Sequence, residues 1–114
     1  MMITIREMQF DDLDQVMAIE EANFSVPWTI NGFFSFLLRE DARFLVAEEA
    51  DKIVGYCGVI LTPPESDITK VCVSEEYRRK GIAQMLLGQL QKDLSKSGIT
   101  TPVSYTHLTL PTIL

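Results

Sequence analysis

The sequence contains little of the chemistry on which several classes of small protein depend. Of its 114 residues, only two are cysteines and one is a histidine. Both cysteines, Cys57 and Cys72, lie inside apolar runs, so we expect buried thiols in a reducing compartment and no disulfide framework. We likewise expect no bound metal.

Positive charge and long apolar runs are also scarce. The formal net charge is −6, which argues against nucleic-acid binding because that requires a positively charged surface. No apolar run approaches the roughly 18 residues that cross a membrane, and Arg6 and Glu7 interrupt any apolar core of a secretory signal. We therefore expect a cytoplasmic protein with neither nucleic acid nor a membrane as its partner. The acidic surface would suit a basic peptide, although solubility is the commoner reason for such a charge.

The rest of the composition is that of one globular domain. Hydrophobic residues make up 46% of the chain and charged residues 23%, which is too apolar for disorder and enough for a modest core. The periodicity of the apolar residues predicts a strand, two helices, three strands and a third helix. The predicted ranges are 3–6, 13–23, 30–38, 43–48, 53–61, 68–73 and 83–97.

Several residues are expected to cap, pack or bend these elements. Residues 11–12 are good caps for the first helix, and Thr29 is a good cap for the second. Phe33 and Phe34 are predicted to be core residues of the second helix. The glycines within 53–61 indicate a bend, a bulge or a close backbone approach in that strand.

The most informative stretch is 68–87, which reads ITKVCVSEEYRRKGIAQMLL. A buried strand is followed by a polar turn, a basic loop with a glycine, and the start of a helix. The first N–H groups of a helix have no partner within it and the helix dipole is positive there, so this order can hold a phosphate group. Gly81 would let an oxygen atom approach the backbone, while Arg78, Arg79 and Lys80 add positive charge. The alternative is that these basic residues are merely solvated, because a single glycine loop is a weak signal.

The string RRKGIA after a VCV strand resembles the Arg/Gln-x-x-Gly-x-Gly/Ala signature of the GNAT family of N-acetyltransferases, where it binds the pyrophosphate of acetyl-coenzyme A. The resemblance implies an α/β fold: the N-terminal two-thirds of the acyl-CoA N-acyltransferase fold, with a mixed, mostly antiparallel sheet, helices on both faces, and truncation after the pyrophosphate-binding helix. The strand would line the pantetheine arm, and a backbone N–H there would polarise the acetyl carbonyl. The implied cofactor-binding residues are Val71, Cys72, Val73, Arg78, Arg79, Lys80, Gly81, Ile82, Ala83 and Gln84.

Ile19-Glu20, Phe24 and Pro27-Trp28, followed by a hydroxyl residue, resemble the opening of the ribosomal-protein-alanine N-acetyltransferases, the RimI type. This resemblance implies acetyl transfer from acetyl-coenzyme A to a protein N-terminal amine, with a ribosomal protein among the expected acceptors. It also implies that the segment between the first two helices lines the peptide groove; the alternative for Pro27-Trp28 is a loop pinned by a buried indole. The central strand is less apolar than is usual in the subfamily, which leaves small-molecule amines open as acceptors.

The catalytic residues are not identified by the sequence. In the family the acceptor amine attacks the thioester directly, and the RimI type uses a glutamate on the fifth strand and a tyrosine on the following helix as base and acid. Neither position occurs in this chain. Glu65 or Asp67 could act through water, but each is better explained as a polar residue at a strand edge. Cys72 as a nucleophile is disfavoured because its apolar neighbours should keep it a thiol.

Residues 102–114 do not continue the pattern of the fold. The string 103–112 resembles the translation, in one reading frame, of a sequencing-library transposon adaptor. We therefore expect a partial acetyltransferase domain at 1–101 and a non-native tail after it. Tyr105 and His107, which would otherwise be candidates for a proton donor and a general base, are assigned no chemistry.

Three functions remain open. The first is a protein N-terminal acetyltransferase of the RimI type, of which this chain is the cofactor-binding part and is expected to be inactive by itself. The second is a related enzyme that acetylates a small-molecule amine. The third is a non-catalytic module that binds coenzyme A or phosphate.

Overall fold

The computed structural model describes residues 2–62 and 65–96 of the chain. The elements follow the predicted order, and the end predicted for the third helix and the tail 102–114 lie outside the described residues. The elements are β1 (Thr4–Glu7), the 3₁₀ turn η1 (Phe10–Asp12), α1 (Leu13–Asn23), α2 (Ile30–Leu37), β2 (Ala42–Glu49), β3 (Lys52–Thr62), β4 (Glu65–Val73), the 3₁₀ turn η2 (Glu75–Tyr77) and α3 (Ile82–Lys96).

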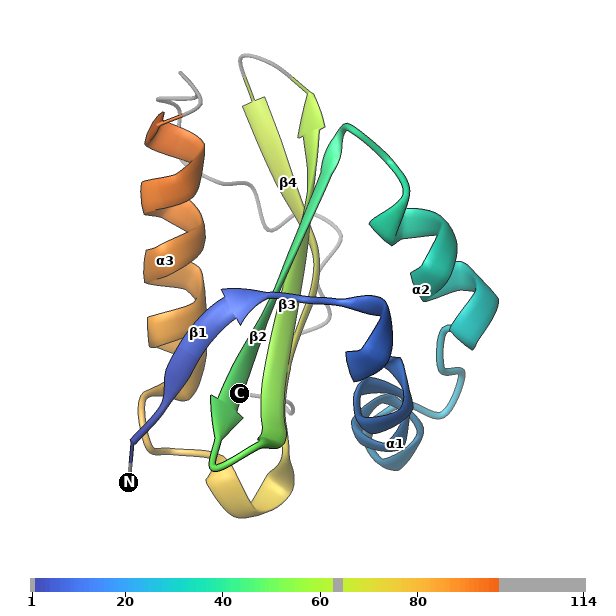
Figure 1. The fold of residues 1–114 in the computed structure, drawn as a ribbon, viewed down its shortest axis with the longest axis vertical. Coiled ribbons are helices and arrows are strands. Elements are labelled where there is room, and N and C mark those ends of the chain that lie inside the picture. The colour runs from blue at the N-terminus through green and yellow to red at the C-terminus, as the bar shows by residue number, and fades with distance from the viewer. Residues whose placement is uncertain (1, 63–64, 97–114) are drawn as a thin grey trace.

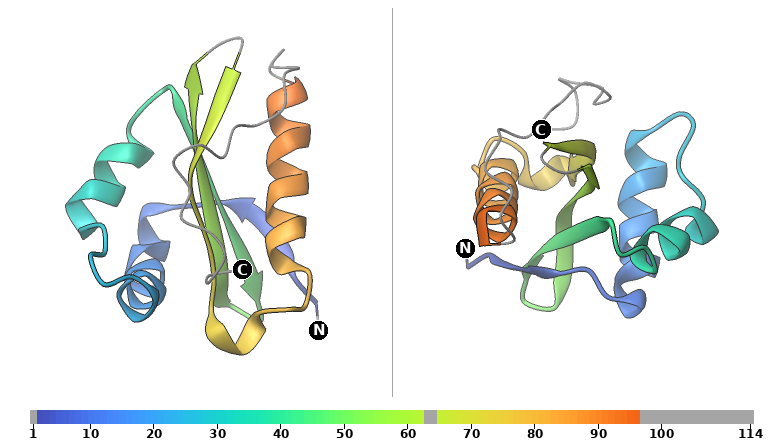
Figure 2. Two further views of the ribbon diagram at one scale, coloured as in Figure 1. Left: turned by 180° about the vertical axis from the view of Figure 1, so that it is seen from behind. Right: turned by 90° about the horizontal axis from the view of Figure 1, so that it is seen from above.

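The four strands form one antiparallel sheet in the order β1-β2-β3-β4 (Figure 1). α3 covers one face of this sheet, while α1 and α2 cover the other, which gives three layers (Figure 2). The predicted α/β fold with helices on both faces is confirmed. The predicted mixture of parallel and antiparallel pairing needs a correction for the part of the chain that the structure describes, where every pairing is antiparallel.

Each face of the sheet has its own hydrophobic core. On the α3 face, Leu86, Leu90 and Leu94 recur at helical spacing and are fully buried. Burying one such side chain stabilises the fold by about 1.5–3 kcal/mol. On the other face the core is aromatic, and the buried rings of Phe33 and Tyr56 meet edge to face with centroids 5.9 Å apart. The strands are therefore fixed between two packed layers.

α1 begins at Leu13, as predicted, but the side chain at its N-cap position does not cap it. The chain becomes helical in a 3₁₀ turn that begins at Phe10, and the Asp12 side chain makes no cap hydrogen bond to α1. Its carboxylate instead accepts the Gln9 N–H at 2.7 Å and pairs with the Arg6 guanidinium at 2.8 Å. Hydrogen bonding to Arg6 holds the pKa of Asp12 below its usual range. This aspartate ties η1 to β1 rather than capping the helix.

One prediction for α2 is confirmed and another is half right. The Thr29 side chain accepts the Gly32 N–H at 3.0 Å, which is the expected N-cap. Phe33 is fully buried, as predicted. Phe34 is 45% exposed and stacks on Phe10 with ring centroids 4.7 Å apart, so its assignment to the core was wrong. The eight-residue helix turns only one of the two adjacent rings toward the sheet.

Gly58 lies at a bulge in the sheet. The β3–β4 register shifts between Gly58 and Val59, which is one of the alternatives that the sequence left open. A Cβ atom added to Gly58 would lie 2.3 Å from Cε2 of Phe44 on the neighbouring strand. The buried Phe44 ring therefore occupies the space that a side chain at position 58 would fill.

Replacing Gly58 by alanine is expected to lower the free energy of unfolding by about 1–3 kcal/mol, because the added methyl group displaces the Phe44 ring. Gly88→Ala is the matched control. Gly88 lies on the exposed side of α3 with nothing within 4 Å of the Cβ position, so alanine should stabilise the fold by about 0.5–1 kcal/mol. Urea unfolding followed by circular dichroism measures both, and losses of equal size would contradict the packing argument.

Candidate functional site

The basic loop 78–81 joins η2 to α3 and has an uncommon backbone. Arg79 and Gly81 have positive φ angles of +63° and +82°. Glycine adopts this conformation at no steric cost, so the backbone itself favours a glycine at position 81. A Cβ atom added there would meet no described atom within 4 Å. Among the described residues, none fills the space in front of the loop.

A cavity of about 380 Å³ opens at the N-terminus of α3. The first i→i−4 hydrogen bond of the helix joins the Met85 N–H to the Gly81 carbonyl at 3.1 Å, so the N–H groups of 82–84 precede it. These groups and the positive end of the helix dipole favour an anion at this place. The residues that line the cavity are Arg79, Gly81, Ala83, Gln84 and Leu87.

Arg78, the first residue of the predicted signature, has a bracing role in this structure. Its Nε donates to the Val73 carbonyl at 3.1 Å, and its terminal nitrogen donates to Oδ1 of Asn23, the last residue of α1. Arg78 does not line the cavity. Its guanidinium joins the end of β4 to the end of α1, which the sequence did not predict.

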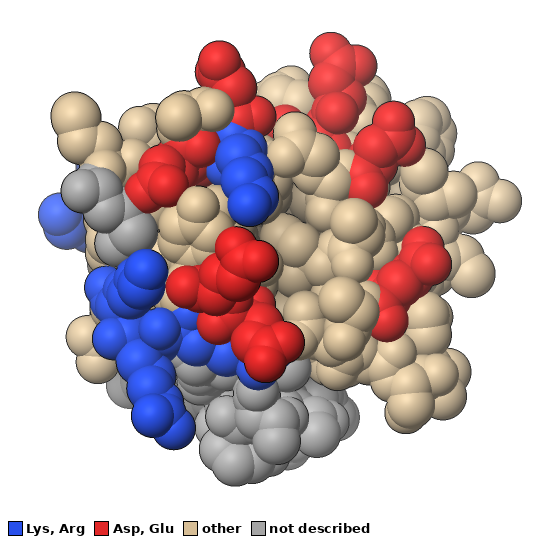
Figure 3. All heavy atoms as spheres, turned by 90° about the horizontal axis from the view of Figure 1, so that it is seen from below, with Lys and Arg blue, Asp and Glu red and all other residues tan. Residues whose placement is uncertain are grey.

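Lys80 is also held beside the cavity rather than within its lining. Its Nζ lies 5.3 Å from the centre of the Tyr77 ring, and the Tyr77 hydroxyl donates to Glu49 at 3.0 Å, which raises the pKa of Tyr77. Arg79 is therefore the one basic residue among the described residues that line the cavity. At this end of the molecule, Lys and Arg side chains gather in one area with Asp and Glu beside them (Figure 3).

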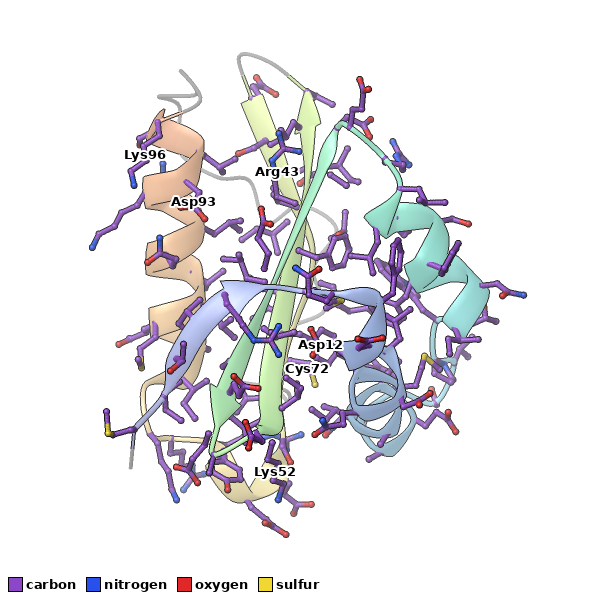
Figure 4. The ribbon with its side chains drawn as sticks, viewed as in Figure 1. Asp12, Arg43, Lys52, Cys72, Asp93 and Lys96 are labelled. Carbon is purple, nitrogen blue, oxygen red and sulfur yellow. The ribbon has the colours of Figure 1, made fainter. Side chains whose placement is uncertain are left out.

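The side chains of the three predicted cofactor-binding residues of β4, 71–73, are buried, so only their main chain is available to a ligand. Val71 and Val73 are buried against α3, while Cys72 is buried on the α1 face (Figure 4). Among the described strands, β4 pairs only with β3, so its other edge carries N–H and C=O groups without a strand partner. That open edge is where an extended ligand could hydrogen-bond to 71–73.

Both cysteines are protonated thiols. Burial raises the pKa of Cys72 to about 11 and that of Cys57 to about 12. The thiolate is the nucleophilic form, so a covalent role for Cys72 is disfavoured by its surroundings, as the sequence indicated.

A buried polar cluster was missed by the sequence reasoning. Glu20 is fully buried and accepts hydrogen bonds from Trp28 N–H, Tyr56 OH and Lys70 Nζ. A usable signal was present, because Glu20 continues the apolar spacing of Leu13 and the other buried residues of α1. A charge on a buried helix face needs a partner, but the sequence could not show which residue supplies it.

The contacts of Trp28 agree with the interpretation in which its indole pins the loop. Its half-buried indole packs against Phe33 and Phe36 with centroids 5.0 Å and 4.9 Å away. The loop is thus pinned by its indole, and a peptide groove beside it stays a prediction.

Within 2–62 and 65–96, no helix is long and apolar enough to cross a membrane, and no three His, Cys, Asp or Glu side chains are placed to hold a metal.

The fold and the loop define a class of acyltransferase, and sequence comparison agrees. The profile of the acetyltransferase (GNAT) family matches residues 13–111, so the chain belongs to this family. A putative [ribosomal protein bS18]-alanine N-acetyltransferase of Bacillus subtilis is 34% identical over 83 residues, which are 72% of this chain and 55% of that protein. The chain thus spans about half the length of that curated relative. The domain boundary at 101 stays a prediction.

Solved structures share the fold. The ribosomal-protein-S18-alanine N-acetyltransferase from Escherichia coli has a TM-score of 0.78 at 24% identity, over 86% of this chain and 63% of that one. The PaiA N-acetyltransferase from Thermoplasma acidophilum, solved in complex with coenzyme A, has a TM-score of 0.77 at 18% identity, over 87% and 76% of the two chains. At these identities the likeness is one of fold alone.

The thiol assignment predicts slow alkylation. In the native protein at pH 8, iodoacetamide should leave Cys57 and Cys72 unmodified, because both are fully buried and their pKa values lie near 12 and 11. Urea should make both react at once. Mass spectrometry of intact protein counts the adducts. Rapid modification of Cys72 in the native protein would show an accessible thiolate and reopen a covalent role.

Proposed function

We propose that the protein transfers an acetyl group from acetyl-coenzyme A to an amine. The observation that carries this proposal is the geometry at the start of α3, where a glycine with φ +82° faces open space beside a cavity of about 380 Å³. A pyrophosphate fits such a place, because it accepts hydrogen bonds from several main-chain N–H groups at once. Arg79 adds a cation to the cavity wall.

The chain's own residues would bind and orient the cofactor. The N–H groups of 82–84 and the Arg79 guanidinium would hold the pyrophosphate, and the open edge of β4 at 71–73 would hydrogen-bond to the amides of the pantetheine arm. Bound acetyl-coenzyme A supplies the activated thioester. A β4 N–H aimed at the acetyl carbonyl would stabilise the negative charge that develops on its oxygen when an amine attacks.

Two protons must move during this reaction. The acceptor attacks as a neutral amine, so its nitrogen must lose a proton as the amide forms, and the coenzyme A thiolate must gain one as it leaves. We assign neither role to a described residue. The raised pKa of about 11 keeps the fully buried Cys72 protonated, so it cannot serve as the base.

For the acceptor we propose a protein N-terminal amine, with ribosomal-protein alanine as the model substrate and the cytoplasm as the place of reaction. The name of the Bacillus subtilis relative and the Pro27-Trp28 segment after Glu20 support this choice. The net charge of −6 is compatible with a basic peptide. Buried free thiols support a reducing compartment.

The test uses the protein produced from the complete gene, acetyl-coenzyme A, and a basic peptide that begins with alanine. Mass spectrometry is expected to find one acetyl group on the α-amine of the peptide. Acetylation of small amines with no reaction on the peptide would replace the acceptor assignment. Binding of coenzyme A without transfer to any amine would contradict enzymatic function and leave a binding module.

Gly81→Val is expected to weaken coenzyme A binding more than tenfold, because a branched residue is strained at φ +82° and would occupy the open space before the loop. Lys80→Ala should weaken the binding free energy of coenzyme A by only about 1 kcal/mol, because the Lys80 ammonium is exposed and lies against the Tyr77 ring. Gly88→Ala, later in the same helix, is the control for helix stability. Calorimetric titration measures all three, and small, equal losses for Gly81→Val and Lys80→Ala would count against a main-chain phosphate site.

A further inference from the structure

The carboxylate of Glu20 joins three separate parts of the chain. It accepts hydrogen bonds from Trp28 N–H at 2.8 Å, from the Tyr56 hydroxyl at 2.5 Å and from Lys70 Nζ at 2.8 Å. These donors belong to the segment 24–29, to β3 and to β4 respectively. Because the bond to Trp28 is to its main chain, the carboxylate fixes the path of the segment and not only the position of a side chain.

The same segment encloses the ammonium of Lys70. Its Nζ lies 3.9 Å from the centre of the Phe24 ring and 4.4 Å from the centre of the Trp28 ring, and the side chain is 8% exposed. Cation–π attraction and the ion pair therefore act together on the two aromatic residues that begin and nearly end the segment. The segment 24–29 is held to β4 by charge as well as by packing.

This attachment lies beside the proposed reaction site. Lys70 precedes Cys72 by two residues in β4, and both side chains face α1. The edge of β4 at 71–73, where the acetyl group would lie, has no partner among the described strands. The segment 24–29 contacts Lys70 on the α1 side of the sheet, two residues from Cys72 in this edge, and its Val26 is 85% exposed.

We propose that Glu20 and Lys70 are positioning residues that set the segment 24–29 for the acceptor substrate, without contributing to the binding of coenzyme A. The proposal rests on the proposed function for its acceptor. Stability alone does not account for the pair, because an apolar pair of similar volume serves a core equally well or better. The hydrogen bond that the Trp28 N–H donates to the Glu20 carboxylate adds direction, which apolar packing lacks.

The experiment compares Glu20→Gln, Lys70→Met and the double variant in the protein from the complete gene. The double variant contains no unpaired buried charge, so it should regain stability that each single variant loses. In all three, the KM for the peptide acceptor is expected to rise about tenfold while the dissociation constant of coenzyme A stays within about twofold. Trp28 is the only tryptophan, so quenching of its fluorescence by acrylamide should increase as the segment loosens.

Asp12→Asn is the matched control. It breaks another carboxylate–cation pair next to α1, with Arg6 at 2.8 Å, but makes no contact with the segment 24–29. It should change neither the acceptor KM nor the quenching of Trp28. Equal effects from Asp12→Asn, unchanged quenching in Glu20→Gln, or a parallel loss of coenzyme A affinity would each overturn the proposal. If the unmodified protein transfers no acetyl group, the proposed function fails, and the quenching comparison alone then decides whether Glu20 positions the segment.

Discussion

The packing of α3 on the sheet is the constraint on which the candidate cofactor site depends. Ile82, the first residue of the helix, is buried together with Leu86 one turn later. Gly55 lies beneath them: a Cβ atom there would be 3.5 Å from both side chains and 3.1 Å from the Cys72 carbonyl. Because the helix approaches β3 this closely, its first turn cannot shift along the sheet, and its N–H groups stay beside the basic loop. The preorganisation of the site is thus a consequence of core packing.

The second constraint acts on β4. Val71 and Val73 are buried in one core and Cys72 in the other, so these three side chains cannot rearrange to contact a ligand. Only the main chain at its open edge is available, and main-chain groups are already fixed in direction by the β3 pairing. A cofactor arm that hydrogen-bonds there would meet donors that need no rearrangement, which is the condition for stabilising charge in a transition state.

Sequence reasoning succeeded where one residue type has one physical meaning. Apolar periodicity located every described helix and strand, because burial of one face repeats along the chain, and the RRKGIA string located the loop. It failed where a contact joins distant residues: Glu20 and Lys70 are 50 positions apart, and Asn23 and Arg78 are 55 apart. Periodicity also could not decide which of two adjacent phenylalanines of α2 faces the sheet, since that depends on how a short helix is rotated.

Backbone strain identifies the loop by a criterion independent of its signature. Three described residues other than glycine have positive φ angles: Ala50, Asp51 and Arg79. Ala50 and Asp51 form the two-residue connection of the β2–β3 hairpin, and positive φ at both positions gives the turn whose twist matches its strands. No hairpin requires +63° at Arg79, where a left-handed conformation costs about 1–2 kcal/mol. Strain without a structural reason gathers at functional sites, and here it places a guanidinium on the wall of the cavity beside the N-terminus of α3.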